Sequence, residues 1–127
     1  MIVSFDFDHT LRFETGELNT TTMLDLHKHI DAGDEVWIIS SRPAIKENRD
    51  FLEAFCKEHA PTVAGIRLTD GHLKIHTLNE IGSTKHFDDD PDELLHCHEW
   101  GIMGVDCFNQ AKWNEHLIEL GVIEPKG

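Results

Sequence analysis

The sequence MIVSFDFDHT at residues 1–10 places two aspartates, Asp6 and Asp8, at the end of an almost continuously apolar segment. Such a segment at residues 2–6 predicts a β-strand that is buried on both faces. A carboxylate that leaves water for an apolar interior loses much hydration free energy unless a partner compensates. A strand that ends on two carboxylates therefore calls for a cation at that point.

The rest of the chain alternates between strand and helix patterns. Apolar strands separated by amphipathic helices predict an α/β fold, a parallel sheet covered by helices on both faces. A turn is expected at Gly16, the Thr20 hydroxyl is expected to cap the first helix, and Pro43 is expected to open the second helix, with Ile45 facing inward. The expected strands are 2–6, 35–40, 64–69, 84–90 and 102–108, and the expected helices are 20–32, 43–60, 72–82, 91–101 and 109–121.

Composition limits the class of protein. A chain of 127 residues with 39% hydrophobic and 28% charged residues is expected to form one globular domain over residues 1–127. The sequence has no apolar run long enough to span a bilayer, and it does not start with a basic and apolar leader. Its three cysteines are an odd number without the spacing of a disulfide framework, which suits a reducing compartment. A cytoplasmic protein without a membrane partner is therefore expected. The net charge of −13 argues against an extended positive surface that would bind the backbone of a nucleic acid.

Three predicted strands end on polar side chains. Asp6 and Asp8 follow the first strand, Ser40 and Arg42 end the second, and residues 88–90 end the fourth. In open parallel sheets, ligands bind beyond the carboxyl ends of the strands. Each aspartate alone could be a helix cap, but several acidic strand ends together predict a site for a hard cation such as Mg²⁺.

Four motifs resemble those of the haloacid-dehalogenase-like phosphohydrolases, in the order that this family has them. DFDHT at residues 6–10 is similar to the D-x-D-x-T signature, and VWIIS at residues 36–40 to the apolar strand that ends in Ser or Thr. Lys74 has the type and position of the family lysine, and HFDDD at residues 86–90 resembles the acidic fourth motif. The resemblance spans residues 2–92 and implies a Rossmann-like three-layer sandwich with strand order 5-4-1-2-3.

The resemblance also implies roles for individual residues. Asp6 would attack phosphorus, and Asp8 would protonate the leaving oxygen and later activate water. Mg²⁺ would be held by the Asp6 carboxylate, the backbone carbonyl of Asp8 and Asp88. Asp89, counted with the metal site, would orient Lys74 or a water ligand of the metal. Ser40 and Lys74 would bind the transferring phosphoryl oxygens, and Thr10 would tie the motif loop together beside the substrate.

Several assignments stay open at the level of sequence. Lys85 competes with Lys74, although it lies inside a predicted strand. Because residues 88–90 are all aspartates, the position of the fourth motif, and with it the choice of metal ligand, is open by one residue. Asp92 is either a metal ligand or an acid stabilised by the helix dipole. His9 stands where many relatives have Gly. Arg42, with Lys46 and Arg49, forms either a solvated face or a clamp for a second anionic group of the substrate.

The substrate is the least determined feature. The short connections after Thr10 and before Lys74 leave no room for a cap domain, so the site is expected to be open or closed by oligomerisation. Residues 86–117 are diffusely similar to the 5′(3′)-deoxyribonucleotidase-like members, which favours a small phosphomonoester such as a nucleotide. A Mg²⁺-dependent phosphatase of small substrates is therefore expected. The alternatives are a phosphatase of nucleic-acid termini, similar to polynucleotide 3′-phosphatases, a non-catalytic phosphoryl-binding domain, and a phosphotransferase.

Overall fold

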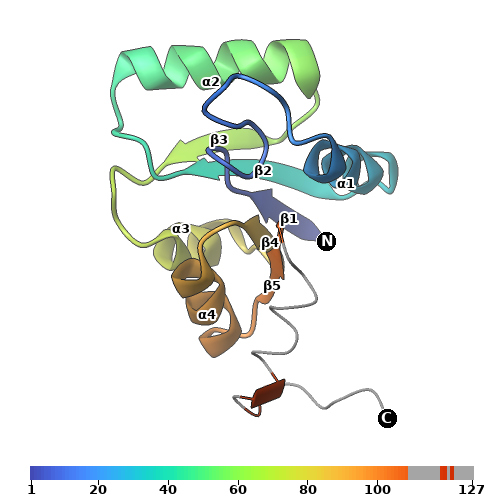
Figure 1. Ribbon diagram of the computed structural model, residues 1–127, viewed down its shortest axis with the longest axis vertical. Coiled ribbons are helices and arrows are strands. Elements are labelled where there is room, and N and C mark those ends of the chain that lie inside the picture. The colour runs from blue at the N-terminus through green and yellow to red at the C-terminus, as the bar shows by residue number, and fades with distance from the viewer. Residues whose placement is uncertain (109–117, 120, 122–127) are drawn as a thin grey trace.

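The fold is built around a sheet of parallel strands, in a computed structural model that describes residues 1–108, 118, 119 and 121 (Figure 1). The strand order is β3-β2-β1-β4-β5, which is the expected order read from the opposite edge. The expected α/β three-layer class is thereby confirmed. The strands are β1 (Ile2–Phe5), β2 (Glu35–Ser40), β3 (Gly65–Leu68), β4 (Lys85–Asp88) and β5 (Met103–Asp106).

Helices cover both faces of this sheet. Alternate side chains of β2 point to opposite faces, as the pleat of a strand requires. Val36 and Ile38 belong to a core with residues of α1 and α2, whereas Ile39 packs with residues of α3 and α4. Figure 1 shows the same division of the helices. The helices are α1 (Thr20–Asp31), α2 (Lys46–His59), α3 (Lys74–Ile81) and α4 (Pro91–Glu99).

Two expected helix starts are wrong. The side chain of Asn19, not of Thr20, caps α1 by accepting the N–H of Thr22 at 3.4 Å. The second helix begins at Lys46 instead of Pro43, because residues 41–45 turn the chain away from the end of β2. Ile45 is the residue before that helix and is 51% exposed, so it does not face the core.

The expected last helix falls largely outside the described residues. Ile118 and Glu119 are described and are helical. The apolar stripe expected at Trp113, Leu117 and Leu120 lies outside the described residues.

No cap domain interrupts residues 1–108. The connection from β1 to α1 is a turn closed by an antiparallel bridge between Arg12 and Leu18, with Gly16 at φ +90° where only glycine is unstrained. The link from β3 to α3, residues 69–73, is shorter still. The carboxyl edge of the sheet is therefore not covered by an inserted domain. Among the described helices, none combines the length and the apolarity that crossing a bilayer requires.

Candidate functional site

Three carboxylates meet at the carboxyl edge of the sheet. Asp6 follows β1, and Asp88 and Asp89 lie at the end of β4, which pairs with β1. The N–H of Asp6 donates to the carbonyl of Phe87 at 2.9 Å, which brings the ends of the two strands together. One carboxylate oxygen from each aspartate lies within 4.8 Å of the others.

The ammonium group of Lys74 links two of these carboxylates. Its Nζ lies 3.0 Å from Asp88 Oδ2 and 3.2 Å from Asp6 Oδ1, and the side chain is almost completely buried. Glu93 of α4 accepts the backbone N–H of Lys74 at 3.1 Å and so fixes the first residue of α3. Lys85 lies elsewhere, with its Nζ 3.2 Å from His29 Nε2.

The carboxylates carry more negative charge than one lysine can balance. Burial, followed by repulsion from Asp88, raises the pKa of Asp6 well above its ordinary value. Burial likewise raises the pKa of Asp89 and of Glu93. The pKa of Lys74 is raised because the attraction of Asp6 and Asp88 outweighs the effect of burial. A second cation at this point would relieve the repulsion.

Asp88 is the exception, because its partners favour the charged form. Burial alone would raise its pKa, but the hydrogen bond from His86, together with the charge of Lys74, holds the pKa well below the ordinary value. His86 Nε2 lies 2.8 Å from Asp88 Oδ2, and the backbone N–H groups of Asp89 and Asp90 donate to Asp88 Oδ1.

A buried chain of hydrogen bonds extends beneath Asp88. His86 Nδ1 lies 2.8 Å from Ser4 Oγ, and Ser4 Oγ lies 2.7 Å from Ser83 Oγ. All three residues are buried. An ionised Asp88 only accepts, so Nε2 of His86 carries a proton and donates. With a neutral imidazole, Ser83 then donates to Ser4, Ser4 donates to Nδ1 of His86, and Nε2 of His86 donates to Asp88.

Thr10 joins the first and fourth motifs. Its Oγ1 lies 3.0 Å from Asp6 Oδ2 and 3.3 Å from Asp89 Oδ1, and the residue is fully buried. One hydroxyl proton can be donated to only one of these oxygens at a time. Thr10 therefore holds the motif loop against the carboxylates, and its contact with a substrate stays a prediction.

Asp8 is not part of the carboxylate cluster and pairs instead with Arg42, in the segment between β2 and α2. Arg42 binds it in a bidentate manner, with Nε 2.8 Å from Oδ2 and Nη2 2.8 Å from Oδ1. The Arg42 guanidinium also lies 5.3 Å from the centroid of the Phe7 ring and 4.9 Å from that of Phe51. The side chain of Asp8 is 39% exposed, so it stays accessible from solvent. Arg42 thus orients Asp8, and a direct bond from Arg42 to substrate stays a prediction.

The other predicted site residues have distinct places. Ser40 is fully buried at the end of β2, where its Oγ accepts the N–H of Arg42 at 3.2 Å. Asp92 lies in the first turn of α4, with its N–H bonded to the capping Asp90, and is outside the carboxylate cluster. Lys46 is exposed and pairs with Asp50 on the same helix.

Sequence reasoning missed His86 and Glu93. His86 stands two residues before Asp88 on one strand, so the pleat places both side chains on the same face. That spacing was a usable signal. Glu93 had none, because its contact with the backbone of Lys74 joins two helices that only the tertiary fold brings together.

The donor set fits Mg²⁺. The carboxylate oxygens of Asp6, Asp88 and Asp89 are hard ligands, they converge within 4.8 Å, and they lie where burial and mutual repulsion favour an added cation. These three residues are the only such group among the residues that the structure describes.

No family model matches this chain, and no curated protein matches it. The function of this chain is therefore inferred from its fold and from the geometry of the carboxylate site.

Proposed function

We propose that this protein is a Mg²⁺-dependent phosphatase of small phosphomonoesters that works through an aspartyl-phosphate. The observation that carries the proposal is the convergence of Asp6, Asp88 and Asp89, two of which, Asp6 and Asp88, contact the buried ammonium of Lys74. The accessible carboxylate of Asp8 belongs to the same motif loop as Asp6. The arrangement supplies a nucleophile, a separate acid and base, and a place for a cation.

The first half-reaction forms a bond from an Asp6 carboxylate oxygen to phosphorus and breaks the bond from phosphorus to the leaving oxygen. Asp8, in its protonated form, gives its proton to that leaving oxygen. Mg²⁺ held by Asp6, Asp88 and Asp89 would neutralise charge so that one anion can approach another. Lys74 has three N–H donors, of which two face Asp6 and Asp88, so one remains for a phosphoryl oxygen.

The second half-reaction hydrolyses the aspartyl-phosphate. Asp8, now ionised, takes a proton from water, the water oxygen bonds to phosphorus, and Asp6 leaves as a carboxylate. Arg42 fixes the plane of the Asp8 carboxylate by the bidentate contact. The buried hydroxyl of Ser40 would donate to a phosphoryl oxygen.

The structure favours small substrates over polynucleotide ends for one reason. Of the cations in the predicted basic stripe, Arg42 lies nearest the site, and it is paired with Asp8. Lys46 of the same stripe is paired with Asp50. Neighbouring phosphates of a polynucleotide would therefore find few free cations among these residues.

The test is phosphate release with and without Mg²⁺ from p-nitrophenyl phosphate, nucleotides, sugar phosphates and 3′-phosphorylated oligonucleotides. Asp6→Asn is expected to abolish turnover while the fold survives, because one negative charge leaves a crowded cluster. Asp31→Asn, an exposed change at the end of α1, is the matched control and should keep full activity. Equal turnover by Asp6→Asn and the parent protein would refute the nucleophile, and metal-independent turnover would refute the role of Mg²⁺.

A further inference from the structure

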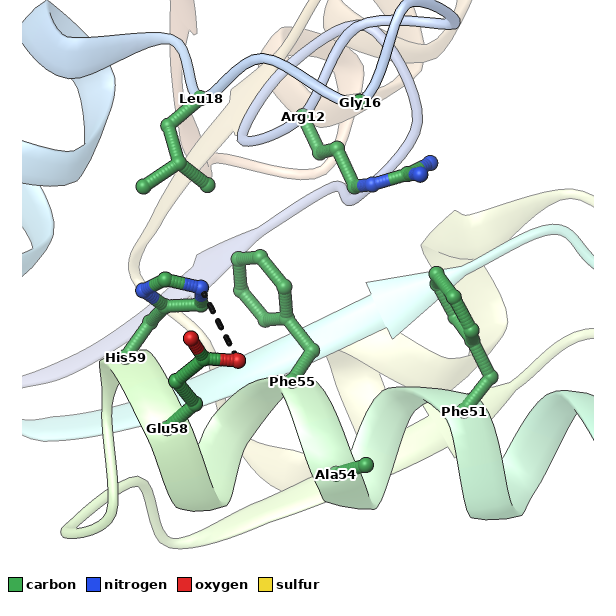
Figure 2. Close-up of a pocket in the computed structure, with 8 residues that line it drawn as sticks. All are labelled: Arg12, Gly16, Leu18, Phe51, Ala54, Phe55, Glu58 and His59. Carbon is green, nitrogen blue, oxygen red and sulfur yellow. Dashed lines mark ion pairs between the residues drawn. The ribbon is translucent and has the colours of Figure 1, made fainter.

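A cavity of about 360 Å³ lies between the turn that follows the first motif and helix α2 (Figure 2). Its size is at the lower end of the range for pockets that hold small organic ligands. In Figure 2, the rings of Phe51 and Phe55 rise from α2 toward the turn, with Arg12 and Leu18 above them. Glu58 and His59 lie at the end of the cavity nearer Leu18.

This cavity is connected to the proposed site through one aromatic ring. The Arg12 guanidinium lies 5.2 Å from the centroid of Phe51, and the Arg42 guanidinium that holds Asp8 lies 4.9 Å from the same centroid. The backbone of Arg12 is also part of the motif loop, since its carbonyl accepts the N–H of His9 at 2.8 Å. A ligand in the cavity would therefore contact the ring that also contacts Arg42, the partner of Asp8.

Arg12 is a cation without a carboxylate partner in the described part of the chain. Its side chain is half-buried, and in a protein of net charge −13 most cations are expected to find an acidic neighbour. The guanidinium lies close to the turn, since a Cβ built at Gly16 would be in ordinary van der Waals contact with Arg12 Nη2 at 3.4 Å. Its N–H groups are thus available to an acceptor inside the cavity.

The lining excludes several ligand classes. A sugar would leave the apolar side chains of Leu18, Phe51 and Phe55 without contacts, and a wholly apolar group would leave the N–H groups of Arg12 without an acceptor. A second phosphate would meet Arg12 but also the carboxylate of Glu58. A flat heteroaromatic ring fits better, because it has an apolar face together with acceptors for Arg12 and donors for Glu58.

From this lining we infer that the cavity binds the base of a nucleoside monophosphate, whose phosphate is the group transferred to Asp6. The inference rests on the proposed function and narrows it to nucleotides as the substrate class. The base would be recognised by Arg12 and Glu58 on its edge and by Leu18 and Phe55 on its apolar surface.

The first experiment does not need turnover. Amide chemical shifts of the ¹⁵N-labelled protein are followed during titration with adenosine or cytidine, and with ribose as the ligand without a base. Shifts at Gly16 and Ala54 with either nucleoside but not with ribose are expected. No shifts at this cavity with either nucleoside would overturn the inference, even if the protein is an active phosphatase.

The second experiment compares nucleoside monophosphates, as 5′ and 3′ isomers, with ribose 5-phosphate by kcat/KM. The parent protein should favour the best nucleotide at least tenfold. Ala54→Phe, which fills the cavity from an exposed helix position, should lower this preference at least tenfold. Glu53→Phe places the same ring on α2 beside a different cavity and should not change it. Thermal melting confirms that both variants are folded.

The two proposals can fail separately. Hydrolysis of monoesters without preference for nucleotides, or an equal loss for all substrates in Ala54→Phe, would overturn the base site and leave the phosphatase standing. Nucleoside binding at the cavity, without hydrolysis of any monoester by the parent protein, would refute the phosphatase and leave a nucleoside-binding site.

Discussion

Asp88 owes its charged state to the groups that donate to it. His86 and Lys74 approach one carboxylate oxygen, and two backbone N–H groups approach the other. Partners that donate hydrogen bonds to a metal ligand set its orientation and its basicity. His86 is therefore a positioning residue for Asp88, supported in turn by Ser4.

Replacing His86 tests this role. His86→Leu should weaken divalent-metal affinity by roughly 10–100-fold, because Asp88 loses a hydrogen bond that orients it. His86→Gln keeps an amide N–H near the position of Nε2 and should recover most of the affinity. Mn²⁺ binding by electron paramagnetic resonance measures this directly, without turnover. If both variants bind Mn²⁺ as the parent does, His86 serves packing alone.

The division of labour between Asp6 and Asp8 gives a second prediction at this scale. Asp8→Asn should still form the phosphoenzyme from p-nitrophenyl phosphate, because p-nitrophenolate leaves without protonation, but its hydrolysis should stall. Mass spectrometry of the quenched variant should find an added phosphoryl group on Asp6. The double variant Asp6→Asn/Asp8→Asn is the control. Normal metal binding without a trapped phosphoryl group would contradict the assigned roles.

Among the elements, the loop from β1 to α1 carries the most backbone constraint. Phe7 accepts the N–H groups of Thr10, Leu11 and Arg12 through its carbonyl, so the chain turns sharply directly after Asp6. His9, inside this turn, has φ +64°, a left-handed conformation that costs a residue with a Cβ about 1–2 kcal/mol. A glycine would adopt this conformation without that cost.

Substitution at His9 should follow backbone geometry. His9 is exposed, so a change affects few contacts. His9→Gly is expected to leave the free energy of unfolding unchanged or raise it by up to about 1 kcal/mol, since relief of strain is partly offset by glycine entropy. His9→Val should lower it by about 1–2 kcal/mol. Urea denaturation measures both. A loss of stability in His9→Gly would mean that the imidazole makes contacts that stabilise the turn.

At the scale of the whole molecule, the surface charge sets the dependence of activity on salt. The net charge of −13 leaves few free cations, and exposed charge contacts are screened over a Debye length of ~8 Å at physiological ionic strength. Under the proposed function, a small substrate would meet one metal and one or two cations, so its KM should change only a few-fold between low and physiological salt.

A polynucleotide end would behave differently. It engages several phosphates, and its affinity falls steeply with salt as the number of neutralised phosphates grows. Measuring KM for a mononucleotide and for a 3′-phosphorylated oligonucleotide over the same salt range separates the two. A lower KM for the oligonucleotide with a steep salt slope would favour a phosphatase of nucleic-acid termini.

The sequence by itself determined the fold class, the strand order implied by the resemblance, and the strand ends on which Asp6, Ser40 and Asp88 stand. These features follow from local patterns, because few arrangements bury both the continuous apolar strands and the apolar faces of the amphipathic helices. Helix starts were less predictable: residues 41–45 form a turn that the proline at position 43 alone did not reveal.

Only the tertiary structure decided which side chains pair. Arg42 binds Asp8 across 34 residues, Glu93 fixes the start of α3, and Ser4 lies beneath His86. Such pairs depend on the distances and directions that the packed sheet and helices impose, and neither residue of a pair carries a local signal for the other. The cavity beside Arg12 has the same origin, since its walls come from a turn and a helix that are distant in sequence.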